Sequence, residues 1–395
     1  MAEPIRILRP GELRLTALPP LALYVHLPWC LVKCPYCDFN SHAAAPGKLP
    51  EAEYIEALMA DLEAALPQVW GRRVMSVFIG GGTPSLFSPE GIDRLLAGLR
   101  ARLPLEPGCE ITLEANPGTF ERDRFRAFRQ AGVTRLSVGV QSFDDAALRR
   151  LGRVHDADQA RAAVAEAAAA FDTFNIDLMY ALPRQGLAEL AADLDQALSF
   201  SPPHLSIYHL TIEPNTRFAG DPPQGLPDDD LASDMLDLIA ARTAAAGLSR
   251  YEVSAFARAG HRCVHNLNYW HFGDYLGLGA GAHGKLSFPD RIERQVRWRE
   301  PGTYRQKAMA GEAVSNVQRL TPAELPAEFM MNALRLAEGF ELGLYAERTG
   351  QGLHTLEAAI AQAESRGWLT RTGGRLVPTP RGFDFLSDVQ LLFLP

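Results

Sequence analysis

The feature that most constrains the fold of this chain is a regular alternation of short apolar segments with helix-forming segments through its first half. Six segments rich in β-branched and aromatic residues predict strands, at 21–27, 76–82, 110–117, 135–142, 174–183 and 204–214. Segments rich in Ala, Leu, Glu and Arg predict helices between them, near 51–65, 89–102, 121–131, 144–151, 157–170 and 187–199. Strands this apolar are buried on both faces, so the repeat predicts an α/β fold with a parallel sheet, either doubly wound or curled into a whole or partial barrel.

The pattern loosens after the sixth predicted strand and changes again near residue 300. The segments 251–257 and 275–286 predict further strands or ordered loops. Helices are expected near 321–336, 341–349 and 354–366, followed by a hairpin with a Gly-Gly turn and a last helix. This order is typical of a small α+β, winged-helix-like domain. The expected division is therefore an N-terminal arm, a core and a C-terminal domain, at 1–20, 21–300 and 301–395.

Charge and cysteine content limit the function classes. The chain has 39 Lys and Arg against 47 Asp and Glu, a net charge of −8, and its C-terminal segment lacks a basic recognition helix, so no nucleic-acid partner is expected. Five cysteines, an odd number, do not resemble a secreted disulfide framework. With no signal peptide and no long apolar run, a cytoplasmic protein is expected, and a homodimer or a peripheral contact at the inner face of the membrane stays open.

Three of these cysteines form a cluster directly after the first predicted strand, in the pattern C-x3-C-x2-C: Cys30, Cys34 and Cys37. Thiolates suit zinc or iron–sulfur clusters. A structural zinc needs four ligands, and His42 could complete a Cys3His set. A [4Fe–4S] cluster held by three cysteines would instead leave one iron open, and an amino acid's amine and carboxylate, such as those of S-adenosylmethionine, could chelate it. Three unligated thiols, a third interpretation, would be prone to oxidation.

Polar residues also gather where the other strands end. The "GGGTPS" loop at 80–85 follows the second strand, and free backbone N–H groups there could meet a carboxylate. Glu114 lies in an apolar strand, where a carboxylate is costly to bury unless it is paired, although such a residue can also be a structural acceptor. Gln141 and Asp177 suit sugar hydroxyls, and Arg153 suits a carboxylate.

The motifs carry a resemblance. In chain order they are "YVHLPWC", "CPYCDFNSH", "FIGGGTPS", "EANPGT", "GVQSF", "LGRVH", "IDLMYALP", "TIEPNT" and "HNLNYW". The C-x3-C-x2-C motif resembles the signature of radical SAM enzymes, and the set resembles the HemW heme chaperones, a family close to oxygen-independent coproporphyrinogen III dehydrogenase. This resemblance implies a partial (β/α)6 TIM-like barrel of the radical SAM type. It also implies a [4Fe–4S] cluster on the three cysteines and S-adenosylmethionine bound by Tyr24, Tyr36, Gly81, Gly82, Thr83, Glu114, Gln141, Arg153, Asp177 and Thr211.

The "HNLNYW" stretch begins at His265, whose imidazole could be an axial ligand of heme iron. Tyr269 and Trp270 could stack on a flat macrocycle, and Cys263 could assist. The other interpretation is a partly buried polar loop that caps the barrel. With the resemblance, His265 becomes the candidate heme ligand, whereas Cys109 is expected to be structural.

Two departures separate the chain from the dehydrogenase. That enzyme has a further cysteine where this chain has Phe39, and it has a longer N-terminal extension. Both favour a heme chaperone that binds heme, a [4Fe–4S] cluster and S-adenosylmethionine and delivers heme to respiratory heme proteins. The dehydrogenase, which converts propionates to vinyl groups by radical oxidative decarboxylation, is the alternative, although no such activity is expected. A zinc-stabilised binding protein is a third hypothesis.

Overall fold

The computed structural model describes residues 13–44, 47–118 and 124–395. Its main feature is a sheet of 12 strands in the order β14-β13-β12-β11-β1-β4-β5-β6-β7-β8-β10-β9. From β11 to β8 all neighbouring strands run parallel. The order has two free ends rather than a closing pair, which is the arrangement of a partial barrel.

The six predicted strands are confirmed. They are β1 Leu21–Leu27, β4 Val74–Gly81, β5 Leu105–Ala115, β6 Arg135–Gln141, β7 Thr173–Tyr180 and β8 His204–His209. The last two end earlier than predicted. Ala181, directly after β7, has a φ of 56°, which is left-handed backbone, and Pro183 follows it. The extended pattern therefore breaks three residues before the end of the apolar run.

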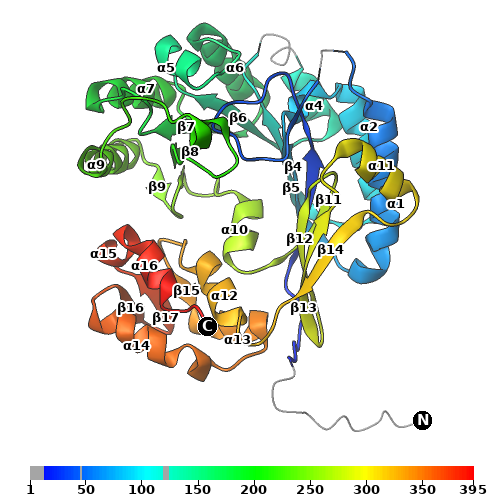
Figure 1. Ribbon diagram of the computed structural model, residues 1–395, viewed down its shortest axis with the longest axis vertical. Helices are drawn as coiled ribbons and strands as arrows, with labels where there is room; N and C mark the ends of the chain where they lie inside the picture. The colour runs from blue at the N-terminus through cyan, green and yellow to red at the C-terminus, as the bar shows by residue number, and fades with distance from the viewer. Residues whose placement is uncertain (1–12, 45–46, 119–123) are drawn as a thin grey trace.

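The predicted helices lie on the outside of this sheet (Figure 1). They are α1 Glu51–Val69, α2 Pro89–Arg102, α4 Phe125–Ala131, α5 Asp145–Arg150, α6 Ala157–Ala170 and α7 Leu187–Ser199. The start of α2 follows from its sequence, because the Ser88 side chain accepts a hydrogen bond from Gly91 N and Pro89 occupies the first turn. Residues 121–123, at the start of the predicted third helix, lie outside the described residues.

Two groups of elements extend the six units. On one side are α8 Arg217–Gly220, α9 Asp229–Ala245, β9 Ser249–Arg250, β10 Ala255–Ala257 and α10 Val264–Trp270. On the other side are β11 Asp274–Leu278, β12 His283–Phe288, β13 Arg291–Arg297, α11 Pro301–Met309 and β14 Val314–Arg319. The parallel pairing of β11 with β1 joins this second group to the start of the barrel. The short 3-10 helices are η1 Pro84–Leu86 and η2 Leu353–Thr355.

The C-terminal segment forms a separate sheet of 3 strands in the order β15-β17-β16. Its elements are α12 Leu325–Ala333, β15 Phe340–Glu341, α13 Leu342–Thr349, α14 Glu357–Ser365, β16 Leu369–Thr372, β17 Arg375–Pro378, α15 Pro380–Asp384 and α16 Leu386–Leu391. The predicted hairpin is confirmed, since Gly373 and Gly374 both have positive φ between β16 and β17.

Two main hydrophobic clusters stabilise these parts. The larger one lies between the outer faces of the barrel strands and their helices, for example Leu23, Ile79 and Leu113 against Leu58 and Leu96. The second belongs mostly to the C-terminal segment but includes Leu13, Leu15, Phe272 and Ile292. Residues from the predicted arm and from the predicted core thus pack with the C-terminal segment. The domain boundaries near 20 and 300 stay predictions. Residues 1–12 of the arm lie outside the described residues.

No helix within the described part of the chain has the length and apolar content needed to cross a bilayer.

Candidate functional site

A cavity of about 360 Å³ lies at the carboxyl ends of β4 to β8, the position where parallel α/β sheets bind ligands. It brings together residues that are far apart in the sequence. All three clustered cysteines line it, together with Tyr36, Gly81, Gly82, Thr83, Glu114, Gln141, Arg153, Asp177 and Thr211. We call this space the first cavity. Of the residues predicted to bind a cofactor, only Tyr24 and His265 are missing from its wall.

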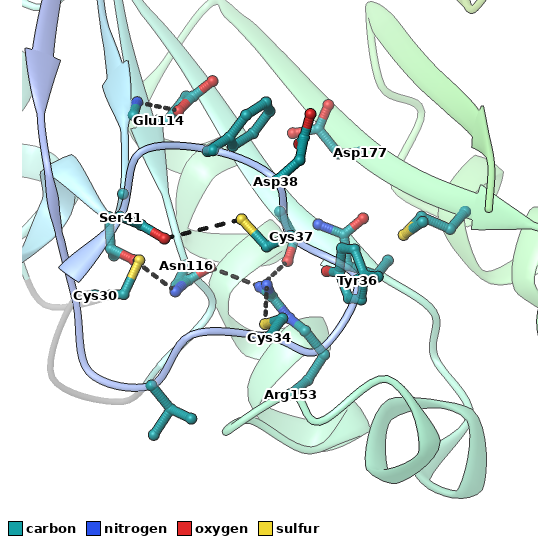
Figure 2. A pocket seen from close by; sticks show the side chains of 18 of the residues that line it. Cys30, Cys34, Tyr36, Cys37, Asp38, Ser41, Glu114, Asn116, Arg153 and Asp177 are labelled. Atoms are coloured by element: carbon teal, nitrogen blue, oxygen red, sulfur yellow. Dashed lines mark hydrogen bonds between the residues drawn. The ribbon is translucent and has the colours of Figure 1, made fainter. Parts of the chain in front are cut away.

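The cysteines lie on one loop between β1 and β3 His42–Ala43 (Figure 2). The loop is held by the pairing of β2 Trp29–Cys30 with β3. Thr83 Oγ1 donates to Cys30 Sγ at 3.5 Å, Arg153 Nη1 donates to Cys34 Sγ at 3.6 Å, and Cys37 Sγ lies 3.9 Å from Ser41 Oγ. All three are partly exposed free thiols. The three cysteines thus line one cavity, and each sulfur has a different polar neighbour.

The sulfurs are not arranged around one point. Within the described ranges, no three His, Cys, Asp or Glu side chains converge closely enough to hold a single metal ion. A cubane does not require such convergence, because each cysteine binds a different iron. Burial raises the pKa of Cys30 and Cys37, so their thiolates are disfavoured unless a positive group lies beside them. A cluster of iron cations is such a group, and the donor set therefore fits a three-cysteine cubane.

The glycine loop after β4 holds the cysteine loop closely. A Cβ on Gly81, whose φ is 118°, would lie 2.7 Å from the His26 ring, and one on Gly82 would lie 2.5 Å from the Trp29 carbonyl oxygen. The backbone N–H groups of Gly81, Gly82 and Thr83 donate to Glu114 Oε2, the Leu27 carbonyl and the Trp29 carbonyl. The expectation that these N–H groups are free for a ligand is wrong, because Glu114 accepts from Gly81 while Gly82 and Thr83 fasten the start of the cysteine loop to the end of β4.

Two carboxylates, Glu114 and Asp177, face the first cavity. Burial, with the charge of Asp177, raises the pKa of Glu114 to about 7, against the opposing hydrogen bond from Gly81 N. Burial also raises the pKa of Asp177, although Asn175 and Ser137 donate to it. Glu114 forms no ion pair with any described residue. A buried carboxylate without an ion pair, such as Glu114, favours a positively charged ligand, and S-adenosylmethionine carries an ammonium and a sulfonium.

Arg153 is placed by the "LGR" turn after α5. The ideal Cβ of Gly152, at a φ of 67°, would lie 2.7 Å from Pro35 Cδ, so this turn packs against the cysteine loop. Arg153 Nη2 donates to Asn116 Oδ1 at 2.6 Å and to the Gly139 carbonyl at 2.8 Å, while its buried Nε has no partner among the described residues. Gln141, at the end of β6, has a φ of 70°, a strained conformation that is enriched at binding sites.

Several lining residues were not predicted to bind a cofactor: Asp38, Asn116, Ser137, Met179, Tyr208, His209 and Glu213. Asn116 is the most connected of them, since its Nδ2 donates to Thr83 Oγ1 at 3.1 Å and its Oδ1 accepts from Arg153. A signal was available for two of them. Asn116 and Met179 each follow a predicted residue by two positions, so they lie on the same side of the strand as Glu114 and Asp177.

Tyr24 belongs to a second cavity, of about 350 Å³, beside the first. Its other lining residues are His26, Asp38, Phe39, Asn40, Tyr269, Tyr275, Gly281, His283 and Arg299. Asp38 and Phe39 line both cavities and form their shared wall. Tyr24 OH lies 2.9 Å from His26 Nδ1, and the other His26 nitrogen donates to the Asn40 carbonyl at 2.9 Å.

His265 lies on α10 with only 1% of its surface exposed. Its Nδ1 lies 3.0 Å from Ser76 Oγ and its Nε2 lies 3.0 Å from Tyr269 OH, so both ring nitrogens have partners. Burial, with the charge of Arg135, lowers the pKa of His265 to about 3, which keeps the ring neutral as an iron ligand must be. Its predicted role as a heme ligand stays a prediction, and it requires Tyr269 to move.

The neighbours of His265 are engaged elsewhere. The Arg335 guanidinium lies over the Trp270 ring, 4.3 Å from its centre. Cys263 Sγ donates to Glu110 Oε1 at 3.6 Å, and burial raises the pKa of its thiol to about 12. Cys109 is 9% exposed and lies outside both cavities, as expected for a structural cysteine.

Comparison with known proteins adds a second line of evidence. A model of the radical SAM superfamily matches residues 24–197, and a model of the HemN C-terminal domain matches residues 320–385. The heme chaperone HemW of Escherichia coli strain K12 is 46% identical over 379 residues, which cover 95% of this chain and 99% of that protein. The heme chaperone HemW of Haemophilus influenzae is 45% identical over 383 residues, covering 95% and 98%.

A solved structure has the same fold. It is the coproporphyrinogen III oxidase HemN from Escherichia coli, described as a radical SAM enzyme, with a TM-score of 0.80 and 23% sequence identity. The superposition covers 95% of this chain and 90% of that one. At this identity the likeness establishes the fold alone, and it extends through both the barrel and the C-terminal segment.

Proposed function

Because this chain belongs to the HemW family of the radical SAM superfamily, we propose that it is a heme chaperone that binds heme and delivers it to respiratory heme proteins. The observation that carries this proposal is the similarity to proteins named heme chaperones over nearly the full length of both chains. A match confined to residues 24–197 would have supported only the superfamily.

The first cavity is the proposed site of a [4Fe–4S] cluster and S-adenosylmethionine. Cys30, Cys34 and Cys37 would hold the cluster. Glu114 offers a carboxylate to the ammonium of the methionine group, and Arg153 offers its unpaired Nε to the carboxylate. The remaining predicted residues would contact the rest of S-adenosylmethionine: Tyr24, Tyr36, Gly81, Gly82, Thr83, Gln141, Asp177 and Thr211. When bound together, the cluster and S-adenosylmethionine supply one-electron chemistry, and the surrounding chain orients them and limits water and oxygen.

Heme is the proposed cargo, with His265 as its predicted axial ligand. In the structure, Tyr269 OH hydrogen-bonds to His265 Nε2, so ligation of the heme iron by this nitrogen would replace a bond that the protein already makes. A ligand held in this way is released when the tyrosine returns, which suits a protein that must hand its cargo to an acceptor.

Oxygen-independent coproporphyrinogen III dehydrogenase activity is the second candidate, and the fold shared with HemN favours it. Phe39 argues against this activity, because the dehydrogenase has a further cysteine at the position where this chain has Phe39. Phe39 lies in the wall of both cavities with 59% of its surface exposed, so it is an apolar contact surface where the enzyme would have a thiol.

One paired experiment tests both candidates. The protein is reconstituted with iron and sulfide without oxygen and checked for S-adenosylmethionine binding. One portion receives heme, is passed over a sizing column and is mixed with an apo-cytochrome. The other receives coproporphyrinogen III, S-adenosylmethionine and a reductant. We expect heme to co-elute and to reach the apo-cytochrome, and no protoporphyrinogen to form. Turnover of the porphyrinogen without heme transfer would contradict the chaperone function and support the dehydrogenase function.

The proposal places the protein in the cytoplasm, with contact to heme acceptors at the inner face of the membrane. Flotation with anionic lipid vesicles, before and after heme loading, tests that contact, and light scattering in the same buffer tests whether a homodimer forms. No nucleic-acid partner is proposed, because the net charge of −8 disfavours one.

A further inference from the structure

We propose that the second cavity binds the carboxylate edge of the tetrapyrrole and that Arg299 pairs with a propionate there. The inference deepens the proposed function and rests on it. The cavity is built from β1, the end of the cysteine loop, α10, β11, the start of β12 and the segment after β13. Apart from the cysteine loop, the first cavity uses none of these segments.

The inference rests mainly on Arg299, whose side chain lines the cavity without a partner among the described residues. Its side chain is exposed and lines the cavity, and it makes no hydrogen bond or ion pair with any described residue. The backbone beside it is fixed, because Asn40 Nδ2 donates to the Arg299 carbonyl at 2.8 Å. The other arginine nearby, Arg294, is already engaged with Glu328 and Tyr275. An unpaired guanidinium that extends from an anchored backbone at a cavity wall is suited to a planar carboxylate.

His283 provides a second unpaired group in the same wall. It is the first residue of β12, and within the described ranges its ring has no hydrogen-bond partner. Partial burial, together with the charges of Arg294 and Arg299, lowers its pKa, so the ring is neutral near pH 7 and offers one donor and one acceptor. His26, by contrast, has both ring nitrogens engaged, with Tyr24 and Asn40.

The rest of the wall is aromatic. Tyr269 and Tyr275 meet edge to face with ring centres 4.4 Å apart, and Tyr24 stacks on Phe78. Phe39 presents an exposed ring at the shared wall. Aromatic faces beside a cation suit a flat apolar ring that carries carboxylates. Asp38 is the only carboxylate among the lining residues, and it lies on the shared wall, toward the first cavity with its other carboxylates.

The volume of the second cavity limits how much of the tetrapyrrole it can hold. At about 350 Å³ it lies at the lower end of the range of roughly 300–1,000 Å³ for small-molecule sites. It therefore accommodates the carboxylate edge, while the remainder of the macrocycle extends over Phe39. Tyr269 is part of this wall and also hydrogen-bonds to His265, so it is the side chain that separates the cavity from the predicted axial ligand.

The test compares hemin with hemin dimethyl ester, which keeps the iron and the ring but removes both carboxylate charges. Soret titrations of the cluster-loaded protein should show tighter binding of hemin than of the ester. Arg299→Gln should weaken hemin binding about tenfold or more and leave ester binding within about twofold, as expected for loss of one charge-assisted hydrogen bond. Arg299→Lys should restore part of the preference for hemin over the ester, because lysine keeps the positive charge but lacks the two parallel N–H donors of a guanidinium.

The matched control is Arg126→Gln, on α4, whose side chain is 70% exposed and pairs with Glu166 on the outer surface. It should change neither titration. S-adenosylmethionine affinity is measured on the same samples. Equal loss for hemin and ester, no loss for either, or a loss confined to S-adenosylmethionine would overturn the inference while heme binding by the unmodified protein persists. If the unmodified protein binds no hemin at all, the proposed function itself fails.

Discussion

The two cavities differ in the charge of their unpaired groups. The first contains three thiols and the buried Glu114, which forms no ion pair with any described residue, together with the Arg153 guanidinium, whereas the second contains the unpaired guanidinium of Arg299, an unpaired imidazole and a set of tyrosines. Only Asp38 and Phe39 separate them. If the proposed ligands bind as inferred, one barrel would hold a cationic cofactor and an anionic cargo in adjoining sites that are built mostly from different strands.

The most severe loss is expected when one of the thiols that line the first cavity is removed. Cys34→Ala should abolish the cluster, because a cubane with two protein ligands is not retained. We expect the iron content to fall from roughly four per chain to near zero, with loss of the charge-transfer absorbance. Iron and labile sulfide analysis of anaerobically reconstituted protein measures this.

The control for that experiment is Cys109→Ala, which removes a cysteine outside both cavities. It should keep the full iron content. Finding one zinc and no labile sulfide in the unmodified protein would contradict the cluster assignment.

The next largest effect is expected at Glu114. Glu114→Gln removes the carboxylate without changing its shape, and S-adenosylmethionine binding should weaken about ten- to a hundredfold, as for loss of a charge-assisted hydrogen bond. Its pKa of about 7 also sets the sign of the pH dependence. Below pH 7 the group is mostly protonated and neutral, so affinity should rise with pH and level off above 7. Isothermal titration between pH 6 and 8 measures both effects.

Glu213→Gln is a suitable control, because this partly exposed carboxylate lines the same cavity from the segment after β8. It should leave the pH profile unchanged. A flat profile in the unmodified protein would mean that Glu114 does not meet the cation.

A smaller effect is expected at His265, because the second cavity is proposed to supply further contacts to the heme. His265→Ala should reduce heme retention about tenfold and leave the iron content of the cluster unchanged. Absorbance at the Soret band after gel filtration gives the retention. Unchanged retention would move the axial ligand elsewhere.

Tyr269→Phe sharpens the same question. The ring remains in the wall of the second cavity, but the hydroxyl that bonds to His265 Nε2 is lost. If that bond competes with iron, this variant should bind heme more tightly than the unmodified protein, by about two- to tenfold for the loss of one hydrogen bond. Weaker binding would show that the hydroxyl supports the ligand rather than competing with it.

The smallest effect is expected at the shared wall. Phe39→Leu keeps an apolar side chain but removes the ring, so heme affinity should fall only about two- to tenfold, the range of one aromatic contact. S-adenosylmethionine affinity should stay the same. An equal loss of both affinities would indicate that Phe39 shapes the loop and makes no specific contact with the macrocycle.

The fold was predictable because its strongest signals are local. Strands such as 21–27 are continuous apolar runs, and helices such as 89–102 carry their own caps, so α2 was found to the residue. The motifs at strand ends were predictable for a related reason, since parallel strands bring their carboxyl ends to one edge. The first cavity therefore followed from the order of short segments along the chain.

The second cavity was not predictable, because it depends on long-range pairing. β11 lies beside β1 although well over half of the chain separates them, and only this pairing brings His283 and Arg299 near Tyr24. The same effect explains why Tyr24 belongs to a different cavity from the other predicted residues. His265 was expected either as a heme ligand or in a partly buried polar loop, and its nearly complete burial comes from the packing of α10 against β4.

The shared wall has a thermodynamic consequence. Asp38 and Phe39 follow Cys37 directly on the loop that would carry the cluster, so their position depends on how that loop is held. Any change in the pair when one cavity fills alters the surface that the other presents. Such coupling is reciprocal: a cofactor that raises the affinity for cargo by some factor is itself bound more tightly by the same factor when cargo is present. The order of loading and unloading would then be governed by a two-residue segment, not by either ligand alone.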